Sequence, residues 1–220
     1  AITPSMLSEC DALTFESEFL DFETWAPQLE AYPGVYPQAE LMRRLANKLE
    51  QKRLFTEMGF RQPKYLEWQP SQELPAGNWV AKLAKQGYDG YGNFFLKNDY
   101  DHKKWQAFVK NAEDKKISIY LEEFCDFEAE CALVIARDLH GKIQSYPLFF
   151  TQQEYGICSW VWGPARDFDP ALAAREVEIK RQAQNFLEKL NYVGVMAFEF
   201  FISPDKQLLL NEIAPRVHNS

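Results

Sequence analysis

Apolar residues recur at steps of three or four positions, or multiples of them, between residues 38 and 58. The residues that carry this pattern are Leu41, Leu45, Leu49, Phe55 and Met58. This spacing places their side chains on one face of a helix, and Gly59 stands where the cap of a helix C-terminus belongs. The pattern therefore predicts one amphipathic helix over residues 38–58.

Two more helices are predicted farther along the chain. The first covers residues 101–112. The second begins at Asp169-Pro170, because a carboxylate at the N-cap followed by proline is typical of a helix start. It continues to Asn191, and its apolar stripe consists of Leu172, Ile179, Ala183, Phe186 and Leu190.

Short apolar runs predict strands around these helices. They cover residues 10–16, 79–83, 117–124, 131–137, 143–150, 195–202 and 207–213. The last two runs are separated by Ser203-Pro204-Asp205-Lys206, so they are predicted to form a hairpin. Residues 60–78, with several prolines and a glycine, are predicted to be a connection that contains a subdomain boundary.

Composition excludes several classes of protein. Of the 220 residues, 46% are apolar, which is enough for a folded core. The net charge is −8 without a long basic run, so the chain lacks the basic face that nucleic-acid binding needs. No run approaches the roughly 20 apolar residues of a membrane-spanning helix, and residues 1–9 do not resemble a signal peptide. We expect a cytoplasmic protein that binds neither nucleic acid nor membranes.

The metal-binding residue types are scattered. Four cysteines and three histidines show no regular spacing and no CxxC pair, so we expect reduced thiols, and any metal should be a hard cation held by carboxylates. The chain opens on Ala1 and stops directly after the polar run 216–220. We interpret it as an excerpt of a longer protein.

Three glycines follow the strand that contains Lys82, in the run 86–93. Glycines allow backbone N–H groups to approach phosphate oxygens closely, and a neighbouring lysine adds a positive charge. The run matches neither the dinucleotide-binding fingerprint nor a Walker A loop. A flexible hairpin tip would explain the same glycines, and a surface charge would explain the same lysine.

Two glutamates, Glu199 and Glu212, lie in the apolar strands of the predicted hairpin. If the strands pair, both carboxylates come onto one face and can share Mg²⁺ ions that bridge nucleotide phosphates. Alternation alone would also place them on the solvent face of a sheet. The polar side chains that crowd the same end favour a site for an anion or a polar acceptor: Asn211, Arg216, His218 and Asn219.

A third pattern is the run 120–125 followed by Glu130. A strand that leads into a short connection can line an adenine pocket, and a carboxylate can hold ribose hydroxyls. By itself, the run is equally typical of an amphipathic strand with acidic flanks.

The order of these parts resembles the ATP-grasp ligases and, within them, the family of 5-(carboxyamino)imidazole ribonucleotide synthases. The matching runs are 80–82, 87–90 with Gly92, 121–124 with Glu130, 192–199 and 211–220. The run 211–220, Asn-Glu-Ile-Ala-Pro-Arg-Val-His-Asn-Ser, is highly specific. The resemblance extends from about Cys10 to the end and is loose over residues 17–45.

The resemblance implies how ATP would be bound. Its phosphates would contact Lys48 and Lys82 and would be covered by a mobile loop made of Gly87, Tyr88, Asp89, Gly90, Tyr91, Gly92 and Asn93. Adenine would be bound by the connection made of Glu122, Glu123, Phe124 and Cys125. Glu130 would bind the ribose, and Gln153 occupies a further ATP-binding position.

The resemblance also implies the metal and acceptor sites. Glu199 and Glu212, with Asn211 beside them, would hold Mg²⁺ or Mn²⁺. The catalytic residues facing the acyl phosphate and the acceptor would be Arg216, His218 and Asn219. In such ligases ATP phosphorylates bicarbonate, and the amine of aminoimidazole ribonucleotide captures the activated carbon, a step of purine biosynthesis. Members of the family are commonly homodimers.

Two departures from the family leave alternatives open. Gln153 stands where the family usually has a histidine, and Ile157-Cys158-Ser159 stands where an arginine or a similar group often occurs. These differences leave open a carboxylate–amine ligase with a different amine acceptor. The ends that the family has and this chain lacks leave open a non-catalytic nucleotide-binding module.

The implied fold class is α/β (α+β), an ATP-grasp core in which two α/β subdomains grip ATP between them. We expect residues 1–37 to be the remnant of an N-terminal domain and residues 38–78 to be a linking helix and connection. Residues 79–150 would form the small subdomain with the glycine-rich loop, and residues 151–220 an incomplete large subdomain with the metal and acceptor site. The family's opening βα unit and C-terminal segment would be missing.

Overall fold

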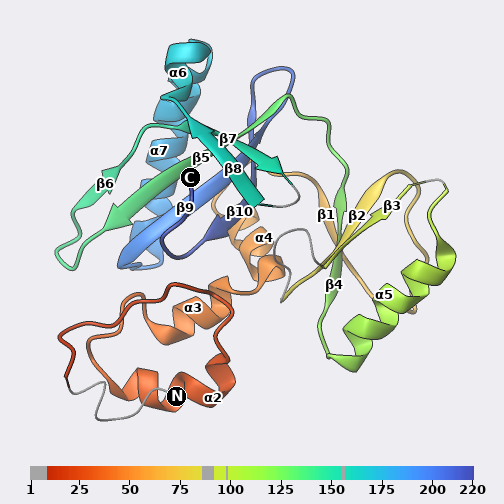
Figure 1. Cartoon of the computed structure of the whole chain (residues 1–220), viewed down its shortest axis with the longest axis horizontal. Helices are drawn as coiled ribbons and strands as arrows, with labels where there is room; N and C mark the ends of the chain where they lie inside the picture. The colour runs from red at the N-terminus through yellow and green to blue at the C-terminus, as the bar shows by residue number, and fades with distance from the viewer. Residues whose placement is uncertain (1–8, 86–91, 98, 155–156) are drawn as a thin grey trace.

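The computed structural model describes residues 9–85, 92–97, 99–154 and 157–220. Two antiparallel sheets dominate it, and helix α4 (Lys48–Glu57) lies between them (Figure 1). A small helical unit at the N-terminus lies below the larger sheet in this view, and the chain runs from it into α4 (Figure 1). This arrangement agrees with the α/β class and the two gripping subdomains that the sequence implies.

The smaller sheet has four strands in the order β1-β4-β2-β3, and every neighbouring pair is antiparallel. Its strands are β1 (Tyr65–Trp68), β2 (Trp79–Leu83), β3 (Asn93–Leu96) and β4 (Ile119–Glu123). Helix α5 (His102–Asp114) begins where Asp101 accepts hydrogen bonds from the backbone of Lys103 and Lys104. It packs Trp105 and Ala112 into the core of this sheet.

The larger sheet has six strands, with β10-β9-β5-β7-β8 in order and β6 paired to β5. Their bounds are β5 (Ala129–Arg137), β6 (Ile143–Ser145), β7 (Phe149–Glu154), β8 (Ile157–Trp162), β9 (Gly194–Ile202) and β10 (Leu208–Ala214). Helices α6 (Ala165–Phe168) and α7 (Leu172–Lys189) join β8 to β9. The predicted hairpin of the last two strands and the predicted helix before it are confirmed.

A phenylalanine cluster holds the larger sheet, α4 and α7 together. Phe55 of α4, Phe186 of α7, Phe198 of β9 and Phe60 are all buried, with ring centroids between 5.4 and 6.3 Å apart. Aromatic rings at these separations gain favourable edge and stacking contacts in addition to the apolar area they bury. The cluster therefore fixes α4, the helix that carries two site lysines, against the sheet that carries the site carboxylates.

The N-terminal unit contains α2 (Phe22–Ala31) and α3 (Ala39–Leu45) around a small core that includes Phe15, Leu29 and Met42. The strand expected at residues 10–16 is wrong, because only an isolated parallel bridge joins Leu13 to Val35. A single bridge offers too few backbone hydrogen bonds to extend into a ladder.

The single helix predicted over residues 38–58 is two helices, α3 and α4. The break lies at Ala46 and Asn47, where the Asn47 side chain accepts hydrogen bonds from the backbone N–H groups of Leu49 and Glu50, at 3.0 and 3.3 Å. Asparagine is a strong N-cap, so it starts a new helix although the apolar spacing continues through the break.

The connection predicted over residues 60–78 contains the strand β1, which pairs with β4 from Tyr65↔Glu122 to Trp68↔Ile119. The sequence did not indicate this strand, because prolines on both sides of it are typical of a connection. The run 143–150 is two strands, β6 and β7, that pair with different stretches of β5. Strand β3 and strand β8 had no prediction.

The expected subdomain boundary at residues 150 and 151 falls inside β7 of the larger sheet. The chain passes from one sheet to the other between Glu123 and Ala129. We therefore propose that the two gripping subdomains divide between β4 and β5, because the division should follow the hydrogen-bonded sheets.

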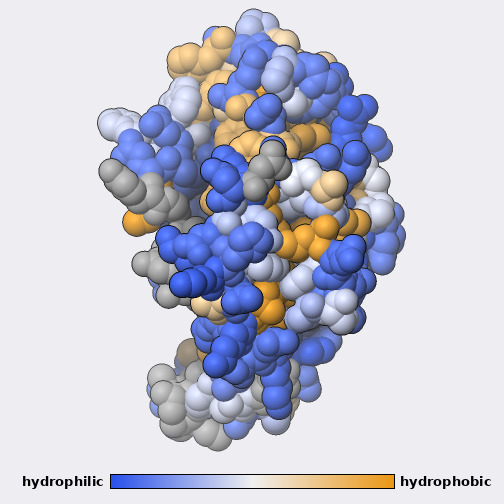
Figure 2. All heavy atoms as spheres, turned by 90° about the vertical axis from the view of Figure 1, so that its right-hand side faces the viewer, coloured by the Kyte–Doolittle hydropathy of each residue, from blue (hydrophilic) through white to orange (hydrophobic). Residues whose placement is uncertain are grey.

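The surface gives no sign of a membrane-spanning element. Within the described ranges, no helix combines the length and apolarity needed to cross a bilayer. The face that carries the smaller sheet is mainly hydrophilic, with hydrophobic atoms gathered in separate patches (Figure 2).

Candidate active site

A cavity of about 400 Å³ is lined by residues of both sheets and of α4. Of the described candidates, all except Gly92 line it: Lys48, Lys82, Asn93, Glu122, Glu123, Phe124, Cys125, Glu130, Gln153, Glu199, Asn211, Glu212, Arg216, His218 and Asn219. Candidates Gly87, Tyr88, Asp89, Gly90 and Tyr91 lie outside the described residues. Candidate residues that lie far apart in the sequence therefore line one cavity.

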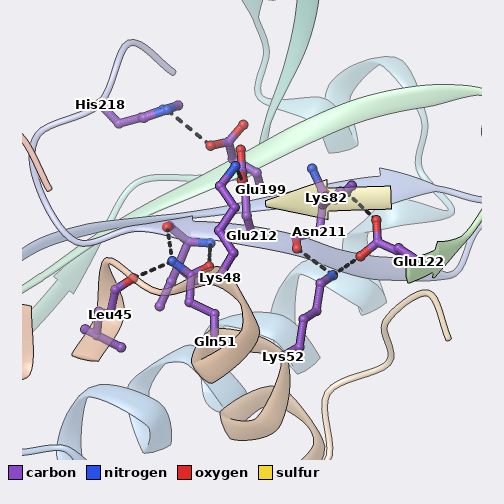
Figure 3. Close-up of polar contacts among 11 residues, drawn as sticks. Leu45, Lys48, Gln51, Lys52, Lys82, Glu122, Glu199, Asn211, Glu212 and His218 are labelled. Carbon is purple, nitrogen blue, oxygen red and sulfur yellow. Dashed lines mark hydrogen bonds and ion pairs between the residues drawn. The ribbon is translucent and has the colours of Figure 1, made fainter. Parts of the chain in front are cut away.

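Lys48 reaches the larger sheet from the first turn of α4. Its backbone N–H donates to Ala84 O at 2.8 Å, and its Nζ lies 2.5 Å from Glu212 Oε2 on β10 (Figure 3). Burial opposes the charge on Lys48, but Glu212 outweighs it and raises the pKa of the lysine. Burial likewise opposes ionisation of Glu212, yet Lys48, with Lys82 and Lys52, lowers the pKa of that carboxyl to about 2.

Glu199 and Glu212 stand directly opposite each other in the β9–β10 ladder, beside an irregularity between Leu210 and Glu212. His218 Nε2 lies 3.2 Å from Glu199 Oε1. Two opposite carboxylates on the cavity wall form an all-oxygen donor pair, which fits a hard cation such as Mg²⁺. Among the described residues no group of three or more His, Cys, Asp or Glu side chains is placed to hold a metal.

Lys52, Glu122, Lys82 and Asn211 form a closed ring of contacts at the floor of the cavity, which we call the lysine–glutamate ring. Glu122 forms ion pairs with Lys52 and with Lys82. Lys52 Nζ donates to Asn211 O at 2.8 Å, and Lys82 Nζ lies 3.4 Å from Asn211 Oδ1. The ring joins α4 and strands of both sheets (Figure 3).

The ring is nearly closed to solvent. Burial favours the neutral form of Glu122, but Lys82 and Lys52 outweigh it and lower the pKa of that carboxyl. Burial, together with the positive charge of Lys82, lowers the pKa of Lys52, while Glu122 acts in the opposite direction. Sequence reasoning missed Lys52. The available signal was its spacing, because Lys52 falls on the apolar stripe with Leu49 and Phe55, where a charged side chain needs a buried partner.

Gln51 is a second residue that sequence reasoning missed. Its Nε2 donates to Leu45 O at 2.7 Å and to Ile213 O at 3.1 Å, and its Oε1 accepts from Ile213 N at 3.1 Å. The bonds to the N–H and the carbonyl oxygen of Ile213 pair a side chain of α4 with the backbone of β10. Gln51 therefore ties α4, which carries Lys48, to the strand that carries Glu212.

Glu130 enters the cavity from β5, opposite Phe201 of β9. Burial, followed by the negative charges of Glu199 and Glu212, raises the pKa of Glu130 to about 7. Near neutral pH this side chain can therefore either donate or accept a hydrogen bond. A ligand with hydroxyl groups suits that property.

One part of the cavity wall is apolar. Phe124 and Cys125 follow β4, and the rings of Phe124 and Phe95 meet edge to face with centroids 6.5 Å apart. The other apolar lining residues are Val80, Phe127, Ile157 and Phe201. An aromatic ring of a ligand would find a flat apolar slot here beside the polar floor, as is usual for nucleotide sites.

Residues near the end of the chain line part of the cavity. The guanidinium of Arg216 pairs with Glu18 of the N-terminal unit, and His218 Nδ1 lies 2.8 Å from Ser220 Oγ. Glu18 and Phe19 also line the cavity, which the sequence did not indicate. The N-terminal unit thus contributes to the wall from which Arg216 approaches.

Comparison with known proteins gives consistent results. The ATP-grasp domain model matches residues 53–220. An N5-carboxyaminoimidazole ribonucleotide synthase of Synechocystis is 33% identical, with 99% of this chain and 56% of the relative aligned. The protein of the same name from Synechococcus elongatus is also 33% identical, over 100% of this chain and 55% of the relative. The chain spans a little over half the length of these relatives.

Solved structures agree. The carboxyaminoimidazole ribonucleotide synthase of Aspergillus clavatus, crystallised with ATP, matches with a TM-score of 0.81 and 25% identity, covering 98% of this chain and 56% of that one. The match of the family model to most of the chain, together with the two sheets that enclose a polar cavity, shows that the chain belongs to the ATP-grasp family.

Proposed function

We propose that this chain forms the ATP-binding and carboxylating core of an N5-carboxyaminoimidazole ribonucleotide synthase. The observation that carries the proposal is the cavity in which Lys48, Lys82, Glu199 and Glu212 meet beside an apolar slot. The names of the relatives supply the substrate class. Because the chain spans about 56% of the first relative, the substrates of the whole protein stay part of the proposal.

The proposed reaction has two steps. A bicarbonate oxygen attacks the γ-phosphorus of ATP, the bond to the β-phosphate breaks, and ADP leaves with the bonding electrons. The amine of aminoimidazole ribonucleotide then attacks the carboxyl carbon, phosphate leaves, and the amine loses a proton to give the carbamate. Both steps build negative charge on phosphate oxygens, so fixed positive charges lower the barrier.

The chain's own residues divide this work by position. Lys82 and Lys48 approach the phosphates from the floor of the cavity, while Phe124 and Cys125 line the adenine slot. Glu130 accepts hydrogen bonds from the ribose. Mg²⁺ held by Glu199 and Glu212 would supply charge neutralisation between the phosphates. Arg216 and His218 orient the acceptor from the C-terminal end.

A second candidate is a ligase of the same fold with a different amine acceptor. Gln153 favours it, because an amide cannot exchange a proton in the way a histidine does, and Gln153 lines the cavity opposite Cys158 in the β7–β8 ladder. The two candidates share every ATP contact and differ only at the acceptor side.

Carbon-labelled bicarbonate tests the proposal. With ATP, Mg²⁺ and aminoimidazole ribonucleotide, the intact protein should transfer label into an acid-labile carbamate, one label for each phosphate released. Label that appears only with another amine would establish the second candidate. Phosphate release without labelled carbamate under any amine would contradict both.

A further inference from the structure

Lys52 is a charged residue for which the proposed reaction has no direct use. Its side chain is 1% exposed, and it is absent from the lining of the cavity as far as the described residues define it. It cannot touch a ligand bound there. Burying an ammonium group destabilises the folded protein unless partners compensate the charge, so the position of Lys52 needs a physical explanation.

The partners of Lys52 suit a charged side chain. One is the carboxylate of Glu122 and the other is the carbonyl oxygen of Asn211, and both are acceptors, which an ammonium group satisfies. Glu122, 3% exposed, pairs with Lys82 as well. The lysine–glutamate ring therefore holds two positive charges and one negative charge.

The position of each charge decides which one a ligand meets. Lys52 lies behind Glu122, whereas Lys82 lines the cavity and its side chain is 14% exposed. Lys52 neutralises the charge of Glu122 on the side away from the cavity. The net positive charge of the ring therefore lies on Lys82. If Lys52 were absent, Glu122 would neutralise Lys82, and the attraction between them would be strong in so dry a place.

We propose that Lys52 is a positioning residue for phosphate binding, acting through Glu122 on Lys82. It keeps the charge of Lys82 available to a nucleotide phosphate and holds the Glu122 carboxylate in the orientation that fixes the Lys82 ammonium. This inference rests on the proposed ATP binding. It adds a residue that never touches the nucleotide but sets the strength with which its phosphates are held.

The competing explanation is structural: Lys52 could merely tie α4 to the two sheets. The two explanations differ in what they affect. A structural tie affects folding and every ligand, whereas the charge relation affects only ligands with phosphates. Removing Glu122 together with Lys52 separates them further, because the double change loses the tie entirely but restores the positive surplus on Lys82.

The test is calorimetric titration of the intact protein with ATP and Mg²⁺, and with adenosine, for the variants Lys52→Met, Lys52→Met/Glu122→Gln and Lys64→Met. Lys64 pairs with Glu123 on the surface and serves as the matched loss of one lysine. We expect Lys52→Met to weaken ATP binding by about tenfold or more at unchanged adenosine affinity, and Lys64→Met to bind both ligands like wild type. Because Glu122 itself lines the cavity, the double variant is judged by the ratio of its ATP affinity to its adenosine affinity, which should return to within about threefold of the wild-type ratio.

Equal ATP binding by wild type and Lys52→Met would overturn the inference while leaving the proposed function intact. A low ratio of ATP affinity to adenosine affinity in both Lys52→Met and the folded double variant would also overturn it, as would a loss of adenosine affinity by Lys52→Met that parallels its loss of ATP affinity. Wild-type protein that binds no ATP would instead contradict the proposed function. If Lys52→Met does not fold, the double variant, which removes both charges of the buried Lys52–Glu122 pair, decides by the same criterion.

Discussion

At the scale of single residues, the site contains two carboxylates that have separate side-chain partners. Glu199 and Glu212 face each other across the β9–β10 ladder, where Glu199 contacts His218 and Glu212 pairs with Lys48. Without a cation between them the two carboxylates repel each other. Each carboxylate has a different partner, and the proposed cation would reduce the repulsion between them.

This pairing predicts that Glu212→Gln and Glu199→Gln each reduce turnover by at least about 100-fold. Each change removes the negative charge of one carboxylate that would hold Mg²⁺ next to the phosphates. The double variant should be hardly worse than either single variant, because both residues serve one site. Steady-state kinetics at saturating Mg²⁺ measure both effects. Glu128→Gln, at a surface pair with Lys206, is the control and should keep full turnover. Multiplicative effects would contradict a shared site.

Glu130 gives a pH prediction. The pKa of Glu130 is raised from 4.5 to about 7 in the folded protein, so between these pH values the folded state binds more protons than the unfolded state. Stability that depends on Glu130 is therefore complete below pH 4.5, decreases as pH rises to 7, and is constant above it. Over this window, wild type should lose about 1–2 kcal/mol of unfolding free energy relative to Glu130→Gln, allowing for partial exposure. Urea denaturation without nucleotide or metal measures it, and parallel pH curves would contradict it.

Most candidate residues could be predicted from the sequence because their chemistry shows in local runs. Asn211 and Glu212 stand in a highly specific run, and Glu130 follows a recognisable strand. Lys52 and Gln51 were missed, because their roles depend on partners more than 60 positions away, Glu122 and Ile213. A helix pattern shows that a polar side chain lies on a buried face but not which partner it meets there.

At the scale of elements, α4 is the part on which the site depends most. It joins both sheets through the lysine–glutamate ring and through Gln51, and the phenylalanine cluster fixes its apolar face. The sequence showed the apolar face of this helix correctly. The sequence did not show where α4 begins, because the apolar spacing continues through Asn47, the residue that caps the N-terminus of this helix.

The cluster predicts a large cost for Phe198→Ala. Phe198 is fully buried against Phe60 and Phe186, so the change leaves a cavity and should lower the unfolding free energy by about 3–5 kcal/mol. Phe168→Ala, at a ring that is 66% exposed, should cost less than about 1 kcal/mol. Denaturant titration of the two variants measures the difference. Similar losses for both would contradict the role of the cluster.

Strand predictions succeeded and failed irrespective of how close the partner lies in the chain, because β5 was predicted although it pairs with the distant β9, and β8 was not although it pairs with β7 directly before it. The hairpin of β9 and β10 is local, and its pairing follows from the alternation on either side of the turn. Strand β1 pairs with β4, more than 50 positions later, and its run is only four residues long. Short strands of this kind are stabilised by their partner and carry little pattern of their own.

At the scale of the whole molecule, residues of both sheets line the cavity. Two cysteine thiols, one beside each sheet, lie in its wall, so their reactivity can be used to detect a bound ligand. Cys125 follows β4 of the smaller sheet, and Cys158 lies in β8 of the larger one. Burial raises the pKa of both thiols, and nearby carboxylates, Glu122 for Cys125 and Glu199 for Cys158, raise it further. Labelling is therefore best followed at alkaline pH.

A nucleotide held between the sheets should protect both thiols together. We predict that ATP with Mg²⁺ slows maleimide labelling of Cys125 and Cys158 by about tenfold, while exposed Cys10 reacts at an unchanged rate. Cys131, which is fully buried, should react only after denaturation. Peptide mass spectrometry of the labelled protein gives each rate separately. Protection of one thiol without the other would place the nucleotide on a single sheet.

We propose that this cavity carries out ATP-dependent carboxylation of an amine. The most direct measurement is phosphate release from ATP by the intact protein, with bicarbonate and aminoimidazole ribonucleotide added separately and together. We predict slow release with either alone and a strong rise when both are present, because the amine removes the activated carboxyl group and completes the turnover. Release that neither compound changes would contradict the claim.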